Sequence, residues 1–120
     1  MSQNINFNTP EIPRMTDVFP QAVITDKLIF LSGTPGLDPA TGNVISQDFE
    51  AQTRQAFQNI KTILEAAGSS MSKIVKTTLF MVTGNEFTII NKIQRIFPIK
   101  CSCKKYAPGY AFPGGNINFN

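Results

Sequence analysis

A glycine- and proline-rich loop reads SGTPGLDPATG from Ser32 to Gly42. It follows KLIFL at residues 27–31, a run of strand-forming side chains, and a second such run, QAVIT, precedes that one at residues 21–25. The two runs are separated by little more than Asp26, which predicts a tight antiparallel hairpin. A glycine loop at the end of a buried strand leaves backbone N–H groups available to a ligand, so we expect the binding site of the chain here.

The pattern of apolar residues after the loop predicts a long helix followed by a strand. Asp48 suits the N-cap of the helix, and apolar side chains recur at three- and four-residue steps from there to Ala67. Gly68 then suits the left-handed C-cap that ends the helix. Residues 74–82, IVKTTLFMV, are almost all apolar or β-branched, which favours a central strand covered by that helix.

A second helix is expected after this strand. Gly84 and Asn85 suit its start, and its inward side chains are Phe87, Ile90 and Ile93. The order β-β-α-β-α indicates an α+β protein in which two helices cover one face of a mostly antiparallel sheet. The other face of the sheet is then left for neighbouring subunits to bury, so an oligomer is expected.

Length and composition bound the organisation of the chain. With 120 residues and 42% hydrophobic content, residues 1–120 are predicted to form one domain with a single core. Residues 1–14 are polar and interrupted by Pro10 and Pro13, so they are expected to be a loose N-terminal arm. They contain no apolar run long enough for a signal peptide or a membrane span, which favours a cytoplasmic protein without a membrane partner.

The composition also excludes several kinds of chemistry. Histidine is absent, which removes Ser-His and Cys-His nucleophile pairs and the usual imidazole metal sites. Cys101 and Cys103 form a lone Cys-x-Cys pair, more typical of incidental thiols than of a zinc site, so no metal is expected. The formal net charge of +3 comes partly from lysines near the C-terminus, so nucleic-acid binding is not indicated.

Four segments resemble the Rid (YjgF) family of reactive-intermediate imine deaminases, which also carries the name endoribonuclease L-PSP. In order and at matching spacing, they are LSGTPGLDPATG (31–42), EAQTRQAFQNIK (50–61), LEAAGSSM (64–71) and VKTTLF (75–80). The resemblance implies a chorismate-mutase-like fold and a homotrimer with pockets between subunits. It also implies hydrolysis of 2-imino acids, such as 2-iminobutanoate and 2-iminopropanoate, or of enamines, to 2-oxo acids and ammonia without a cofactor.

The resemblance also points to site residues, because in the family the ligand carboxylate meets an arginine and a backbone N–H. Gly33 matches the glycine of the binding loop, and the open alternative is a simple turn at the strand end. Ser32 lies beside it and is either a substrate contact or a structural residue. Phe19 stands where many relatives have tyrosine, so it either forms a wall of the pocket or packs in the core.

Three other charged residues are candidates for a role in chemistry. Lys76, in the predicted central strand, is either a carboxylate partner, a solvated edge residue or one half of an intersubunit salt bridge. Asp38 is assigned to a turn and Glu50 to the first turn of a helix, and neither is assigned to chemistry.

Residues 94–120 depart from the family pattern. The family arginine, found in a Pro-Ala-Arg-Ser motif, is missing, and so is the glutamate of the last strand that orients water. Neither Arg54 nor Arg95 aligns with that arginine. Lys104 and Lys105 lie close to its place, but a lysine does not reproduce the bidentate guanidinium fork.

A shift of reading frame accounts for this departure. Residues 93–110, read one base later with permissible codons, can spell Pro-Ala-Arg-Ser, and residues 115–119 can become the strand-like Glu-Ile-Leu-Ile-Ser. We therefore infer a frameshift or a decayed gene, and we expect the printed residues 98–120 to supply no strand that completes the sheet. A well-folded protein is expected to carry the corrected residues, with an extended chain that returns past Gly33 into the sheet.

The leading functional prediction is a homotrimeric hydrolase that acts on small carboxylate-bearing imines or enamines. Because two polar residues of the family site are absent as printed, one alternative is a non-catalytic trimer that binds a small ligand, such as a 2-oxo acid, in the same clefts. A third alternative is RNA cleavage with inhibition of translation, an activity that has been attached to relatives.

Overall fold

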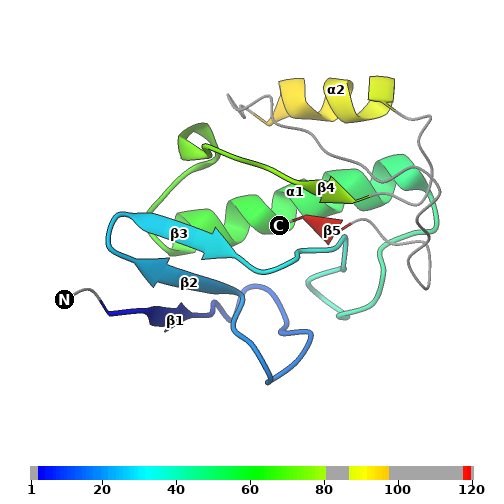
Figure 1. The fold of residues 1–120 in the computed structure, drawn as a ribbon. Coiled ribbons are helices and arrows are strands. Elements are labelled where there is room, and N and C mark those ends of the chain that lie inside the picture. The colour runs from blue at the N-terminus through cyan, green and yellow to red at the C-terminus, as the bar shows by residue number, and fades with distance from the viewer. Residues whose placement is uncertain (1–2, 81–86, 98–117, 120) are drawn as a thin grey trace.

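The structure is a computed structural model that describes residues 3–80, 87–97 and 118–119 (Figure 1). Short strands and two helices make up an α+β fold, and each strand pairing is antiparallel, so the predicted fold class is confirmed. The elements are strands β1 (Ile5–Phe7), β2 (Ala22–Thr25) and β3 (Leu28–Leu31), helix α1 (Phe49–Ala66), the 3-10 helix η1 (Met71–Lys73), strand β4 (Leu79–Phe80), helix α2 (Phe87–Ile96) and strand β5 (Asn118–Phe119).

The predicted hairpin is confirmed as β2 and β3. Its register pairs Ala22 with Leu31 and Thr25 with Leu28, which leaves a two-residue turn. Asp26 in that turn has a φ of 50°, a left-handed conformation that Asp tolerates better than most residues.

The expected loose arm is wrong for Ile5–Phe7, which form β1 along the free edge of β2 (Figure 1). Pro10 and Pro13 follow this strand, so they interrupt the chain after it and remove none of its backbone donors. Phe7 is half-buried and packs beside the core cluster that contains Ala22. Apolar burial and ladder hydrogen bonds therefore order a segment whose polar composition suggested otherwise.

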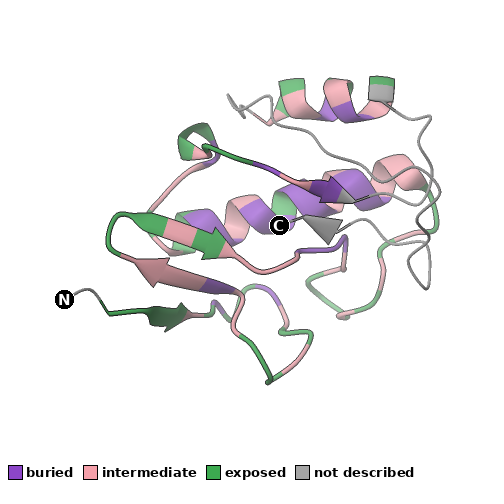
Figure 2. Cartoon of the chain, viewed as in Figure 1, coloured by how far each residue is buried: buried purple, intermediate pink, exposed green. Residues whose placement is uncertain are grey.

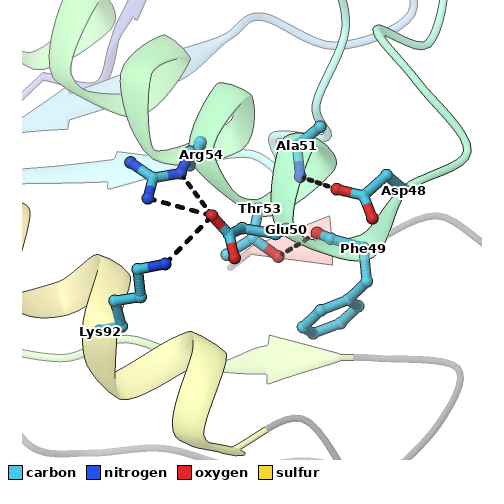
Figure 3. Close-up of polar contacts among 7 residues, drawn as sticks. All are labelled: Asp48, Phe49, Glu50, Ala51, Thr53, Arg54 and Lys92. Carbon is cyan, nitrogen blue, oxygen red and sulfur yellow. Dashed lines mark hydrogen bonds and ion pairs between the residues drawn. The ribbon is translucent and has the colours of Figure 1, made fainter.

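The long helix has both predicted ends. The Asp48 carboxylate accepts a hydrogen bond from the Ala51 backbone N–H at 3.0 Å, which satisfies one of the donors that a helix start leaves open (Figure 3). At the other end Gly68 has a φ of 88°, and the Ser69 N–H donates to the Leu64 carbonyl at 2.8 Å. This is the left-handed closure for which glycine is preferred.

The core packs against α1, many of whose residues are buried (Figure 2), and it consists of two clusters. One cluster joins Ile63 to Ala22 of β2 and to Ile12 in the preceding loop. The other joins residues of α1 to Met71, to Leu79 of β4 and to the fully buried Ile90 and Ile93 of α2; its α1 members are Ala56, Phe57, Ile60 and Leu64. The apolar stripe predicted for α1 thus supplies its buried residues, and of the side chains predicted to face inward from α2, Ile90 and Ile93 are buried.

The predicted central strand over residues 74–82 is wrong for most of its described length. Only Leu79–Phe80 form a strand, and residues 74–78 carry no strand pairing. Val75 and Lys76 are exposed, so this run does not have the two covered faces that its composition suggested. Strand propensity reports how well side chains fit a covered sheet surface. It does not show whether a neighbouring strand is present to pair with. The described strands consequently form two sheets, β1-β2-β3 and β4-β5, instead of one.

Asn118 and Phe119, as printed, form β5 and pair antiparallel with β4. The expectation that residues 98–120 supply no strand is therefore wrong here, because ladder hydrogen bonds use backbone groups that any non-proline residue has. Gly84, Asn85 and the rest of residues 98–120, including Cys101, Cys103, Lys104 and Lys105, lie outside the described residues. Within the described ranges, neither helix is long and apolar enough to cross a membrane.

Candidate functional site

A cavity of about 40 Å³ opens beside the glycine loop. Its lining comes from three parts of the chain: residues 12–16 and 19–21, residues 32–35 and 37, and Asn59 with Ile63 of α1. Phe19, Ser32 and Gly33, the three site residues predicted from the sequence, all line it. The structure therefore brings the predicted residues together, although Phe19 lies far from the loop in sequence.

The polar groups of Ser32 bind the neighbouring segment of the chain. Its N–H donates to the Gln21 carbonyl at 3.0 Å, and its hydroxyl donates to the Pro20 carbonyl at 2.7 Å. These bonds occupy the donors of Ser32 and give it a structural role beside the cavity.

The next two residues of the loop, Gly33 and Thr34, also line the cavity. Among the described residues, no acceptor pairs with the backbone N–H of Gly33 or of Thr34, although both residues line the cavity. The Thr34 side chain is committed elsewhere, because its hydroxyl donates to the Ser32 carbonyl at 2.9 Å. Two adjacent unpaired N–H groups at a cavity are suited to a ligand that accepts hydrogen bonds, above all an anion.

Phe19 lies at the cavity with 44% of its surface exposed. That exposure contradicts the alternative in which it is a core aromatic residue. Its ring is an apolar surface of the cavity that carries no hydroxyl group.

Gln21 is a cavity residue that sequence reasoning missed. Its side-chain oxygen accepts from the Thr9 N–H at 2.8 Å, and its side-chain nitrogen donates to the Ile12 carbonyl at 2.7 Å. Its own N–H donates to the Asn8 side chain at 2.9 Å. A glutamine at the start of an apolar strand was the available signal, and its bonds hold residues 8–12 against the hairpin.

Asn59 is the second residue that was missed. It is 1% exposed, and its Nδ2 donates to the carbonyl oxygens of Pro35 at 3.2 Å and Leu37 at 2.9 Å. Its Oδ1 accepts from the Gln55 side chain at 2.8 Å. A polar amide within the run of helical residues that the apolar pattern predicts to be buried was the available signal, because such a buried group needs partners.

The remaining charged candidates lie away from the cavity lining. Lys76 is exposed and is not a lining residue. Asp38 accepts from the Ala40 N–H at 2.9 Å inside the turn, as its predicted role requires. Glu50 pairs with Arg54 at 3.1 Å on α1 and with Lys92 of α2 at 3.5 Å (Figure 3), so it joins the two helices.

Fold and cavity together define a small α+β protein with an anion-compatible site beside a glycine loop. The family model for Endoribonuclease L-PSP matches residues 10–101 of the chain. The chain therefore belongs to the endoribonuclease L-PSP family, the Rid/YjgF proteins, which confirms the resemblance found in the sequence.

Individual relatives agree with this assignment. A RutC family protein of Pyrococcus horikoshii is 35% identical over 85 residues, which are 71% of this chain and 68% of the relative. The human 2-iminobutanoate/2-iminopropanoate deaminase is 34% identical over 88 residues, which are 73% of this chain but only 64% of the relative. The crystal structure of RidA from the Antarctic bacterium Psychrobacter sp. superposes with a TM-score of 0.83 at 28% identity and covers 92% of this chain and 91% of that one.

Proposed function

We propose that this protein hydrolyses small 2-imino acids, or the enamines in equilibrium with them, to 2-oxo acids and ammonia. Membership of the family and the name of the human relative support the reaction class. The observation that carries the proposal concerns Gly33 and Thr34, whose N–H groups have no acceptor among the described residues, at a cavity that Phe19 also lines. Such a site is suited to a short ligand with one anionic end and one apolar end.

The reaction requires little from the protein. Water adds its oxygen to the imine carbon, the carbon–nitrogen bond then breaks, and the nitrogen leaves as ammonia with the protons that water supplied. Holding the carboxylate on the loop N–H groups orients the imine carbon for this attack. In this proposal the ring of Phe19 contacts the alkyl part of the ligand.

We further propose that the protein works as a homotrimer. Leu28 and Phe30 of β3 are 51% and 58% exposed. Their side chains lie on one face of the strand, and those of Ile29 and Leu31 lie on the opposite face, which packs against the core. Apolar side chains in that position are typical of a face covered by another subunit. The cytoplasmic location expected from the sequence stays a prediction.

The test is turnover of an imino acid generated in the cuvette by an amino-acid oxidase, with the remaining imine trapped by semicarbazide. We expect the protein to accelerate loss of the imine above the rate in buffer. Replacing Phe19 by Ala should lower that acceleration, whereas Val18→Ala, at an exposed neighbour outside the lining, should leave it unchanged. An unchanged rate of imine loss with the purified protein would contradict the proposal.

One observation favours the non-catalytic alternative. Among the described lining residues, none is Asp or Glu, so no carboxylate of that set is available to move a proton. A protein that binds 2-oxobutanoate but leaves the imine decay unchanged would be a ligand-binding member of the family. RNA cleavage stays a prediction from the sequence.

A further inference from the structure

We infer that Arg14 binds the ligand carboxylate in this cavity, in place of the family arginine that the sequence lacks. The inference takes the identity of the ligand from the proposed function. Arg14 is the one charged residue among the described lining residues. An anionic ligand that enters the cavity therefore meets a single full positive charge in this part of the protein.

The guanidinium of Arg14 makes one hydrogen bond to the protein and keeps other N–H donors for a ligand in the described structure. Its Nη2 donates to the Phe19 carbonyl at 3.2 Å, which ties the side chain to another lining residue. In the described part of the chain, its other N–H groups meet no acceptor and no carboxylate pairs with it. A guanidinium has five donors, so enough remain for a two-point contact with a carboxylate.

The other arginines of the sequence are placed differently. Arg54 is paired with Glu50 along α1, and it is not a lining residue. Arg95 is exposed in the last turn of α2, also outside the lining. Position therefore selects Arg14 from the three arginines of the sequence.

The backbone just before Arg14 is held in place. The carbonyl of Ile12 accepts a hydrogen bond from the Gln21 side chain at 2.7 Å, and Ile12 itself is buried in the core. The Arg14 residue is exposed, and its bond to the Phe19 carbonyl restrains the guanidinium. An arginine restrained by such a bond loses less conformational entropy on binding than an arginine without one.

The ligand class follows from the hydrogen-bond donors and from the apolar residues that line the cavity. Arg14 supplies a planar fork, and Gly33 and Thr34 supply backbone N–H groups from a different part of the chain. The ring of Phe19, another lining residue, adds an apolar group, so the lining suits a short carboxylate with an alkyl end. We therefore assign it to short 2-imino and 2-oxo monocarboxylates.

The test measures binding of 2-oxobutanoate and of its neutral amide by isothermal titration calorimetry, with the full chain and without turnover. Arg14→Gln should weaken binding of the acid by about 10- to 100-fold, and Arg14→Lys by less. The amide should bind the wild type and Arg14→Gln alike. Arg54→Gln, which removes an arginine outside the cavity, should change neither ligand by more than about twofold.

Unfolding midpoints equal to wild type establish that the variants fold. Equal affinity of wild type and Arg14→Gln for the acid would overturn the inference, and so would a wild type that does not bind the acid at millimolar concentration. Failure of the proposed function looks different: the acid binds in an Arg14-dependent way while imine decay is unchanged. Conversely, if Arg14→Gln hydrolyses the imine with an unchanged KM, the inference about Arg14 is wrong and the proposed reaction stands.

Discussion

The side-chain nitrogen of Asn59 lies 2.9 Å from the carbonyl oxygen of Leu37 and donates to it. Through this bond, helix α1 fixes the loop that lines the cavity. The helix makes a second such bond to Pro35. Loop position is therefore set by the helix, so the site depends on a residue that need not touch the ligand.

Replacing Asn59 by Leu should lower the free energy of unfolding by about 2 kcal/mol. The change leaves two loop carbonyls without the donor that they have in the native state. Urea denaturation monitored by circular dichroism measures the effect. The matched control is Gln58→Leu at the exposed neighbouring position, which should stay within about 0.5 kcal/mol of wild type. Equal losses in both variants would contradict this account.

Replacing Gly36 by Ala should destabilise the protein by about 3 kcal/mol. A Cβ at this position would overlap the backbone of Gln52, and a backbone cannot rotate away as a side chain can. Gly68→Ala is the comparison, because Gly68 has a φ of 88° but nothing within 4 Å of its Cβ position. It should cost about 1 kcal/mol from conformation alone. Thermal unfolding of the two variants side by side shows which substitution costs more stability. A larger loss for Gly68→Ala than for Gly36→Ala would contradict the prediction.

Replacing Asp48 by Ala should cost about 1 kcal/mol, because α1 then loses its N-cap acceptor. Asp48→Asn keeps a side-chain oxygen for the Ala51 N–H and should recover most of the loss. Chemical denaturation of the three proteins gives the comparison. If Asn is as damaging as Ala, the capping bond is not the source of the stability.

Replacing Thr77 by Val should raise the free energy of unfolding by about 1 kcal/mol. In the part of the chain that the structure describes, the Thr77 hydroxyl is buried without a hydrogen-bond partner, and removing it recovers a desolvation cost. Thr53→Val is the matched control, since Thr53 is also buried but donates to the Phe49 carbonyl at 2.8 Å (Figure 3). Stabilisation by both substitutions would show that added hydrophobicity, and not the unpaired hydroxyl, is responsible.

Replacing Phe30 by Glu should dissociate the proposed trimer, because a charge would have to be buried on the exposed face of β3. Light scattering during size-exclusion chromatography should give three chain masses for the wild type and one for the variant. Gln47→Glu adds the same charge at an exposed site before α1 and should remain a trimer. A wild type that elutes as a monomer at micromolar concentration would refute the proposed assembly.

Local patterns predicted the parts of the fold that depend on neighbours in the sequence. The hairpin, the N-cap at Asp48 and the closure at Gly68 each follow from residues within a few positions of one another. The strand predicted at residues 74–78 did not form because a strand also needs a partner, and β-branched composition does not reveal one. The prediction of a loose arm was wrong at β1 for the opposite reason, since the edge of β2 offered a partner to a polar segment.

The site shows the same division. Phe19, Ser32 and Gly33 were predicted from a motif, and the structure places all three at one cavity. Gln21 and Asn59 were missed because their importance lies in hydrogen bonds to carbonyls of other segments. Arg14 was missed because nothing in a proline-interrupted polar stretch shows which of its side chains will line a cavity.

The pairing of β4 with β5 has a consequence for the order in which the molecule is assembled on the ribosome. The β1-β2-β3 sheet needs only residues up to Leu31, whereas Leu79 and Phe80 have no strand partner in the described chain until Asn118 and Phe119 have been synthesised. Through that interval the nascent protein presents β4 as an open strand edge beside an incomplete core. Chaperone capture and co-translational aggregation should therefore concentrate on this stage of synthesis.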